Sequence, residues 1–176
     1  MTASGRPAIP APSAWNLANA LTVLRLFLVP LFGWLLLRDS GSDELSRVAA
    51  FVVFAAAMVT DKLDGDLAGS RGLVTDFGKI ADPIADKALI GTAFVGLSIL
   101  GQLWWWVTIV VLVREVGVTV LRFVVIRHGV IPASRGGKTK TALQAMAITL
   151  YVLPLPDAFN PLRVAVMALA VAVTVV

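Results

Sequence analysis

The sequence predicts an all-α fold: a polytopic membrane protein built as a six-transmembrane-helix bundle with a polar cavity that faces the cytoplasm. Hydrophobic residues make up 58% of the chain, and the mean hydropathy of +0.86 is far above that of a soluble domain. The apolar residues come in runs separated by short polar segments, which is typical of a helical membrane bundle. Cysteine is absent from the sequence, which excludes disulfides and thiolate metal sites.

Six helices are expected in chain order. Residues 1–13 are small, Pro-rich and polar, so we expect a disordered N-terminal tail ahead of one membrane-embedded domain at residues 14–176. The last apolar run is short for a span and predicts either a short sixth helix or a truncated one. The expected helices cover residues 21–37, 45–67, 77–100, 104–126, 142–153 and 162–176.

The distribution of positive charge predicts the orientation in the membrane. The loops at 62–87 and 127–140 carry four Lys or Arg residues each, whereas the alternate loops carry two (Arg38 and Arg47), none and one (Arg163). Because cytoplasmic loops are enriched in Lys and Arg, both rich loops and the N-terminus are expected on the cytoplasmic side of the membrane.

Acidic residues gather between two of the apolar runs, where carboxylates at the ends of membrane helices are costly. Asp61 and Asp64 are three residues apart, so they share one helical face. Asp82 and Asp86 are four residues apart and share another. If the turn-rich segment 69–75 folds the second pair back onto the first, the four carboxylates converge and need one or two hard divalent cations. A solvated acidic loop between two helices is the alternative.

Polar side chains of two other helices are spaced to reach the same point. Asn19, Thr22 and Arg25 follow one another at three-residue steps in the first helix, which favours a face that lines a cavity. A snorkelling arginine with local hydrogen bonds is the alternative. In the fourth helix, Arg114 and Arg122 lie within about 80° of each other and are expected to face the bundle interior. A purely structural ion pair with the neighbouring Glu115 stays open.

A basic segment leads directly into the fifth helix. Lys138, Lys140 and Thr141 lie at this junction, which would let them reach the same cavity. A topology signal or a contact with anionic lipid is the alternative. The sequence lacks the pattern of aromatic and basic residues that stacks on bases, so nucleic acid is not an expected partner.

The acidic stretch carries a recognisable spacing. The pattern D-x-x-D-G-x-x-A, nine residues and then G-x-x-x-D-x-x-x-D resembles the signature of the CDP-alcohol phosphatidyltransferases. The family usually has arginine directly after the alanine, where this chain has Gly69, and Arg71 lies two residues further on. The chain keeps the spacing of the pattern at Asp61, Asp64, Gly65, Ala68, Gly78, Asp82 and Asp86.

The resemblance implies a metal-dependent enzyme that uses Mg²⁺ or Mn²⁺, with two ions expected. In the family, the first three aspartates bind the metals, and the fourth is both a ligand and the catalytic base. The implied metal ligands are Asp61, Asp64, Asp82 and Asp86, with Asp86 as the base. The implied CDP-binding residues are Asn19, Thr22, Asp61, Asp64, Gly65, Ala68, Gly69, Arg71 and Gly78. The residues expected to bind the acceptor's phosphate are Arg114, Arg122, Lys138, Lys140 and Thr141.

The implied reaction transfers the phosphatidyl group of CDP-diacylglycerol to an alcohol and releases CMP. The Arg114–Glu115 dipeptide and the G-K-T-K-T run look like the branch of the family whose acceptor is sn-glycerol 3-phosphate. Inositol phosphate and phosphatidylglycerol stay open as acceptors, and so does a different class of protein, a non-enzymatic divalent-cation transporter. Membrane lipids are expected partners. The sequence leaves the oligomeric state open, a homodimer included.

Overall fold

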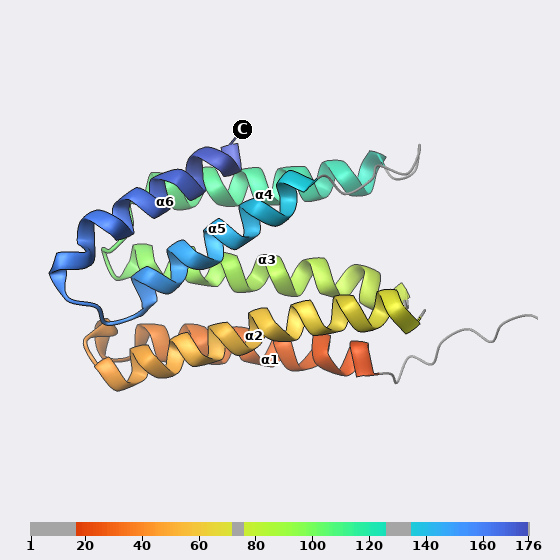
Figure 1. Cartoon of the computed structure of the whole chain (residues 1–176), viewed down its shortest axis with the longest axis horizontal. Helices are drawn as coiled ribbons and strands as arrows, with labels where there is room; N and C mark the ends of the chain where they lie inside the picture. Colours follow the sequence, from red (N-terminus) through yellow and green to blue (C-terminus); the bar gives the residue numbers. More distant parts are fainter. Residues whose placement is uncertain (1–16, 72–75, 126–134, 176) are drawn as a thin grey trace, which may run out of the picture.

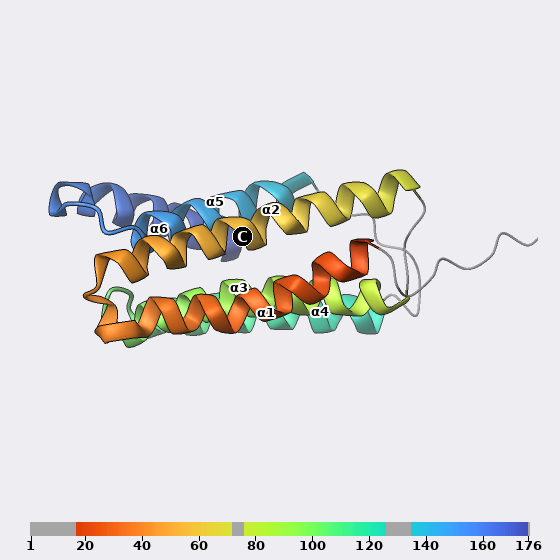
Figure 2. The same cartoon turned by 90° about the horizontal axis from the view of Figure 1, so that it is seen from below.

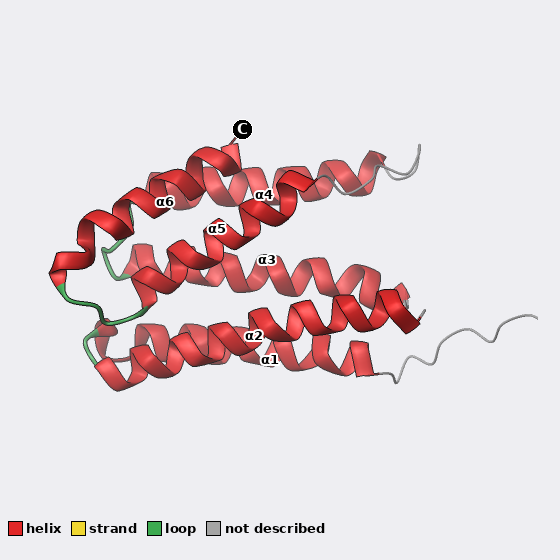
Figure 3. Cartoon of the chain, viewed as in Figure 1, coloured by secondary structure: helices red, strands yellow, loops and turns green. Residues whose placement is uncertain are grey.

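The computed structural model describes residues 17–71, 76–125 and 135–175, with the side chains left out at 18, 64–71, 76–77, 79, 122–125 and 135–139. The described part is all-α with six α-helices, as the sequence predicted (Figures 1 and 3). The tail at 1–13 and the loops at 72–75 and 126–134 lie outside it. The elements are α1 (Leu17–Leu37), η1 (Arg38–Gly41), α2 (Glu44–Arg71), α3 (Asp76–Ile99), α4 (Trp105–Val125), α5 (Arg135–Val152), η3 (Asp157–Phe159) and α6 (Asn160–Val175).

The helices form two layers of three. Figure 2 shows α1, α3 and α4 in one layer and α2, α5 and α6 in the other. Across the layers, α1 packs on α2, α3 on α5, and α4 on α6. Successive helices run in opposite directions, so the connections at 38–43, 100–104 and 153–159 share one end of the bundle, here called the distal end (Figure 1). The end of α2 and the start of α3 lie at the other end, here called the motif end.

Most helices begin earlier than the sequence predicted, among them α1 at Leu17, α2 at Glu44 and α5 at Arg135. The carboxylate of Asp43 accepts hydrogen bonds from the backbone N–H (3.2 Å) and the hydroxyl (2.5 Å) of Ser46, which caps α2 and holds the pKa of Asp43 below its ordinary value. Arg47, whose charge was assigned to the preceding loop, lies in the first turn of α2. Helix α5 begins at Arg135 rather than 142. Its two glycines each cost about 1 kcal/mol of helix propensity, a penalty small enough for tertiary packing to override.

Helix α2 also ends later than expected. It continues to Arg71, so Gly69, Ser70 and Arg71 belong to its last turn rather than to the predicted turn-rich segment. The acidic motif thus starts inside a continuous helix, and Asp61 is placed by the regular geometry of α2.

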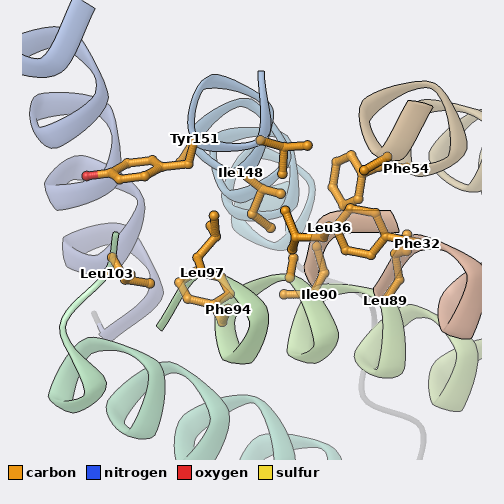
Figure 4. Packing of buried hydrophobic residues seen from close by; sticks show 14 of the residues in the cluster. Phe32, Leu36, Phe54, Leu89, Ile90, Phe94, Leu97, Leu103, Ile148 and Tyr151 are labelled. Carbon is orange, nitrogen blue, oxygen red and sulfur yellow. The ribbon is translucent and has the colours of Figure 1, made fainter. Parts of the chain in front are cut away.

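The hydrophobic core fills the distal half of the bundle. Phe32 of α1 and Phe54 of α2 contact each other with ring centroids 5.4 Å apart, and Phe94 of α3 and Ile148 of α5 complete the centre of the core (Figure 4). The buried polar residues Asn19, Thr22, Arg25, Glu115 and Lys140 lie nearer the motif end, whereas Ser46, Arg47 and Ser98 are buried at the distal end. A polar interior therefore lies on the motif side of the apolar core.

Small residues let α1 and α3 approach closely, and Gly96 tests this packing. A Cβ atom at Gly96 would lie 2.7 Å from Cδ2 of Leu36, which is itself fully buried. We expect Gly96→Val to lower the free energy of unfolding by about 1–3 kcal/mol, the usual range for overpacking a core. Gly117→Val is the matched control, because a Cβ there meets no atom within 4 Å. Equal losses in the two variants, measured by unfolding in detergent, would contradict this close approach.

The outer surface of the bundle is strongly apolar. Phe27, Trp34, Val113 and Val164 are among many large apolar side chains that are more than half exposed. Among the described residues, Asn19–Gly41 and Asp157–Val175 are the two segments that are long and apolar enough to cross a membrane. Arg25 of α1 and charged residues of α2, α3, α4 and α5 form the polar interior described next.

Candidate functional site

Arg25 joins three helices at the motif end. Its side chain is fully buried on α1, and its Nη1 lies 2.9 Å from Oδ1 of Asp61 on α2 and 2.8 Å from Oδ1 of Asp86 on α3. A buried guanidinium is costly unless it is paired, and these two carboxylates pair it. Arg25 thus lies inside the bundle instead of snorkelling to the surface.

The third described aspartate of the motif is held by the same face of α1. The hydroxyl of Thr22, one turn before Arg25, donates a 2.5 Å hydrogen bond to Oδ1 of Asp82. Asn19, one further turn back, is also buried, as is Gly78 one turn before Asp82 on α3. The three-residue steps in α1 therefore present Asn19, Thr22 and Arg25 to the interior.

A small cavity lies beside these carboxylates. Its volume is about 20 Å³, enough for a single water-sized occupant. Asp61, Asp86 and Thr141 supply its polar lining, so the start of α5 meets α2 and α3 here. The apolar part of the lining consists of Ala57, Met58, Leu89 and Ile90.

A second group of charges, here called the Glu115 cluster, consists of Lys87, Arg114, Glu115 and Lys140. Glu115 of α4 is only 3% exposed. Its Oε2 accepts a hydrogen bond from Nζ of Lys87 on α3, and its Oε1 accepts one from Nζ of Lys140 on α5. Nη1 of Arg114 lies 3.6 Å from Oε1. One carboxylate therefore ties α3, α4 and α5 together.

The two groups are neighbours because consecutive residues contribute to each. On α3, Asp86 contacts Arg25 and Lys87 contacts Glu115. On α5, Lys140 contacts Glu115 and Thr141 lines the cavity. The described acidic group holds three carboxylates and one guanidinium, whereas the Glu115 cluster holds three cations and one carboxylate. An excess of negative charge thus lies beside an excess of positive charge.

The acidic group has the chemistry of a divalent-metal site. Carboxylate oxygens are the ligands that Mg²⁺ and Mn²⁺ take, and the excess negative charge favours a cation. Among the side chains that the structure describes, no three acidic or histidine residues lie close enough together to hold a metal ion. Asp64 lies one turn after Asp61 on α2, with its side chain outside the described part.

Several other predicted site residues are placed only by their backbone. Their side chains lie outside the described part, so the structure does not show what they contact. All lie in the last turns of α2 or α4 or in the first turn of α5, which are at the motif end. They are Asp64, Gly65, Ala68, Gly69, Arg71, Arg122 and Lys138.

Lys87 is the site residue that sequence reasoning missed. It directly follows Asp86, and its spacing within the helix indicates no partner for it. A usable signal was present, because a lysine at the start of the apolar run 88–100 needs an anion and Glu115 is the acid of the next helix. The partner of Lys140 was also unexpected, since that lysine was predicted to face an acceptor phosphate and here contacts Glu115.

Comparisons with known proteins identify the family of this chain. The family model of the CDP-alcohol phosphatidyltransferases matches residues 15–176. A protein of Mycobacterium tuberculosis named probable phosphatidylglycerophosphate synthase is 55% identical over 161 residues, which are 92% of this chain and 77% of that protein. The CDP-diacylglycerol–glycerol-3-phosphate 3-phosphatidyltransferase of Bacillus subtilis is 36% identical over 79% of this chain and 77% of its own length. A cardiolipin synthase (CMP-forming) of Streptomyces coelicolor is 38% identical over 66% of this chain and 54% of its own length. The chain belongs to the CDP-alcohol phosphatidyltransferase family.

Proposed function

We propose that this chain is a transferase of phospholipid biosynthesis that moves the phosphatidyl group of CDP-diacylglycerol to sn-glycerol 3-phosphate. The products are phosphatidylglycerophosphate and CMP. The observation that carries the proposal is the pair of oppositely charged groups at one end of an apolar-surfaced bundle, in a chain whose similar proteins bear these activities in their names. The acidic group suits the metal ions that accompany a lipid diphosphate. The positive charge of the Glu115 cluster suits the phosphate of a soluble ester.

The acidic group is assigned to the nucleotide and its metals. Asp61, Asp64, Asp82 and Asp86 would hold one or two divalent ions, Mg²⁺ or Mn²⁺, which when bound neutralise the charge of the diphosphate. The CDP moiety is assigned to the α1 and α2 residues around them. These are Asn19, Thr22, Asp61, Asp64, Gly65, Ala68, Gly69 and Arg71, with Gly78 of α3.

Asp86 is assigned the proton transfer. Its carboxylate accepts the proton of the glycerol hydroxyl while that oxygen forms a bond to the phosphorus attached to diacylglycerol. The bond from this phosphorus to the oxygen of CMP breaks, and CMP leaves with the electron pair. Arg25 orients Asp86 through the 2.8 Å contact, so the base has a fixed position before substrate arrives.

The Glu115 cluster is assigned to the acceptor's phosphate. Its excess positive charge would be compensated by a phosphate dianion, which accepts charge-assisted hydrogen bonds from arginine and lysine. Arg114, Lys140 and Thr141 are the described residues of this subsite, and Arg122 and Lys138 are assigned to it from their places on α4 and α5.

A membrane location is supported by the apolar outer surface, and the family is membrane-bound. We propose that residues 14–176 form one membrane-embedded unit in which all six helices cross the bilayer and the motif end faces the cytoplasm. Arg47 and Arg163, which were counted against this orientation, donate hydrogen bonds to backbone carbonyls at the distal end. They are therefore structural, and the remaining charge bias favours the motif end more strongly. The homodimer stays a prediction.

An acceptor panel tests this function. Purified protein in detergent is given CDP-diacylglycerol, Mg²⁺ and one acceptor at a time, and both CMP and the lipid product are measured. We expect phosphatidylglycerophosphate with glycerol 3-phosphate and little CMP with inositol phosphate. Cardiolipin from phosphatidylglycerol would instead support the activity named for the Streptomyces coelicolor relative. CMP release with none of the acceptors would contradict the proposed transfer.

A further inference from the structure

We propose that Glu115 is a positioning residue for the acceptor, acting through Lys87 and Lys140, and that Lys87 is a further cation of the acceptor subsite. This inference rests on the proposed function and deepens it. Glu115 holds the two ammonium groups where the acceptor's phosphate binds, and does not itself touch substrate. It therefore sets the affinity for the acceptor.

The first support is an excess of cations around one carboxylate. A single lysine is sufficient to neutralise a buried glutamate, yet Lys87 and Lys140 each occupy one of its oxygens and Arg114 lies near by. Glu115 balances only one of these three positive charges, so two are left in excess. This excess of positive charge indicates a binding site for a second anion, which we infer to be the phosphate of the acceptor.

The second support is where the cations come from. Lys87, Arg114 and Lys140 belong to three different helices, and within the described part of the chain each of them forms its ion pair with Glu115. Without a central anion, the like charges would repel and the flexible lysine side chains would turn away from one another. With it, their geometry exists before the phosphate arrives, which reduces the ordering cost of binding.

The third support is exposure. The Lys87 and Arg114 side chains are 38% and 30% exposed, whereas Glu115 is 4% exposed. An entering phosphate can therefore reach Lys87 and Arg114 from the open side, while the carboxylate stays behind them and Lys140, whose side chain is 10% exposed, lies deeper. This arrangement separates residues that touch the acceptor from the residue that positions them.

Glu115→Gln tests the inference, because it keeps the shape of the side chain and removes its charge. We expect the KM for glycerol 3-phosphate to rise about tenfold or more, as when a charge-assisted contact is lost, and the KM for CDP-diacylglycerol to change less than about twofold. Glu44→Gln is the charge-matched control, because Glu44 is exposed in the first turn of α2. A purely structural role would lower the active fraction and leave both KM values unchanged.

A double-mutant cycle tests whether Glu115 acts through the lysines. Lys87→Met should raise the acceptor KM by itself, and adding Glu115→Gln should then have a clearly smaller effect than in the wild type. Full additivity would overturn the inference. If Glu115→Gln does not fold, Glu115→Asp keeps the charge with a shorter reach and should still raise the acceptor KM selectively. An active wild type with unchanged acceptor KM in these variants refutes the inference alone, whereas an inactive wild type refutes the proposed function.

Discussion

Asp82→Asn is expected to lower turnover by about 100- to 1000-fold while the helical fold is retained. Asp82 has an assigned metal-ligand role, and its described contact is a single hydrogen bond from Thr22, which an asparagine oxygen can still accept. Loss of a ligand to an ion that neutralises the diphosphate removes several kcal/mol of charge stabilisation, and each 1.36 kcal/mol is a factor of ten in rate. The measurement is CMP release at saturating CDP-diacylglycerol and Mg²⁺.

Binding of the metal itself gives a second readout. Mg²⁺ should raise the unfolding temperature of the wild type and have a smaller effect on Asp82→Asn, because a ligand that binds the native state stabilises it. Asp39→Asn is the matched control, since Asp39 is exposed in η1 at the distal end. Near wild-type turnover and Mg²⁺ stabilisation in Asp82→Asn would remove Asp82 from the metal site.

Arg47→Met is expected to give the largest loss of stability, about 3 kcal/mol or more. Nε of Arg47 donates to the carbonyl of Val152 at 2.9 Å and Nη2 donates to the side chain of Gln102 at 3.0 Å; Nη2 also donates to the carbonyl of Tyr151. These carbonyls belong to the last turn of α5, where no helical N–H follows to satisfy them. Methionine fills similar space and leaves the buried acceptors unpaired, which costs about 1–3 kcal/mol for each group.

Arg38, an exposed arginine at the same end of the bundle, provides the control. Arg38→Met removes an exposed arginine at the same end of the bundle and should change the free energy of unfolding by less than about 1 kcal/mol. Below its unfolding temperature, the Arg47→Met protein should retain the acceptor KM of the wild type, because Arg47 lies at the distal end. A stability equal to that of Arg38→Met in detergent would show that the hydrogen bonds to α5 contribute little.

The sequence by itself predicted the helices and the shared faces of the motif residues. Helical periodicity is local, so the spacing of Asp82 and Asp86 on α3 and of Thr22 and Arg25 on α1 could be interpreted without a partner helix. Apolar runs likewise located all six helices to within a few residues, except at the start of α5. There, two glycines and several polar residues give a low helix propensity and no apolar pattern.

Only the tertiary structure decided which charge meets which. Arg25 pairs with Asp61 and Asp86, and Lys87 and Lys140 both contact Glu115, so each of these contacts joins two different helices. Spacing along one helix states which face a residue occupies, but it carries no information on which other helix covers that face. The role of Arg47 also depends on a second helix. The sequence near a helix start does not show whether a cation belongs to the loop or to the helix. Only the contact with the end of α5 shows that Arg47 is structural.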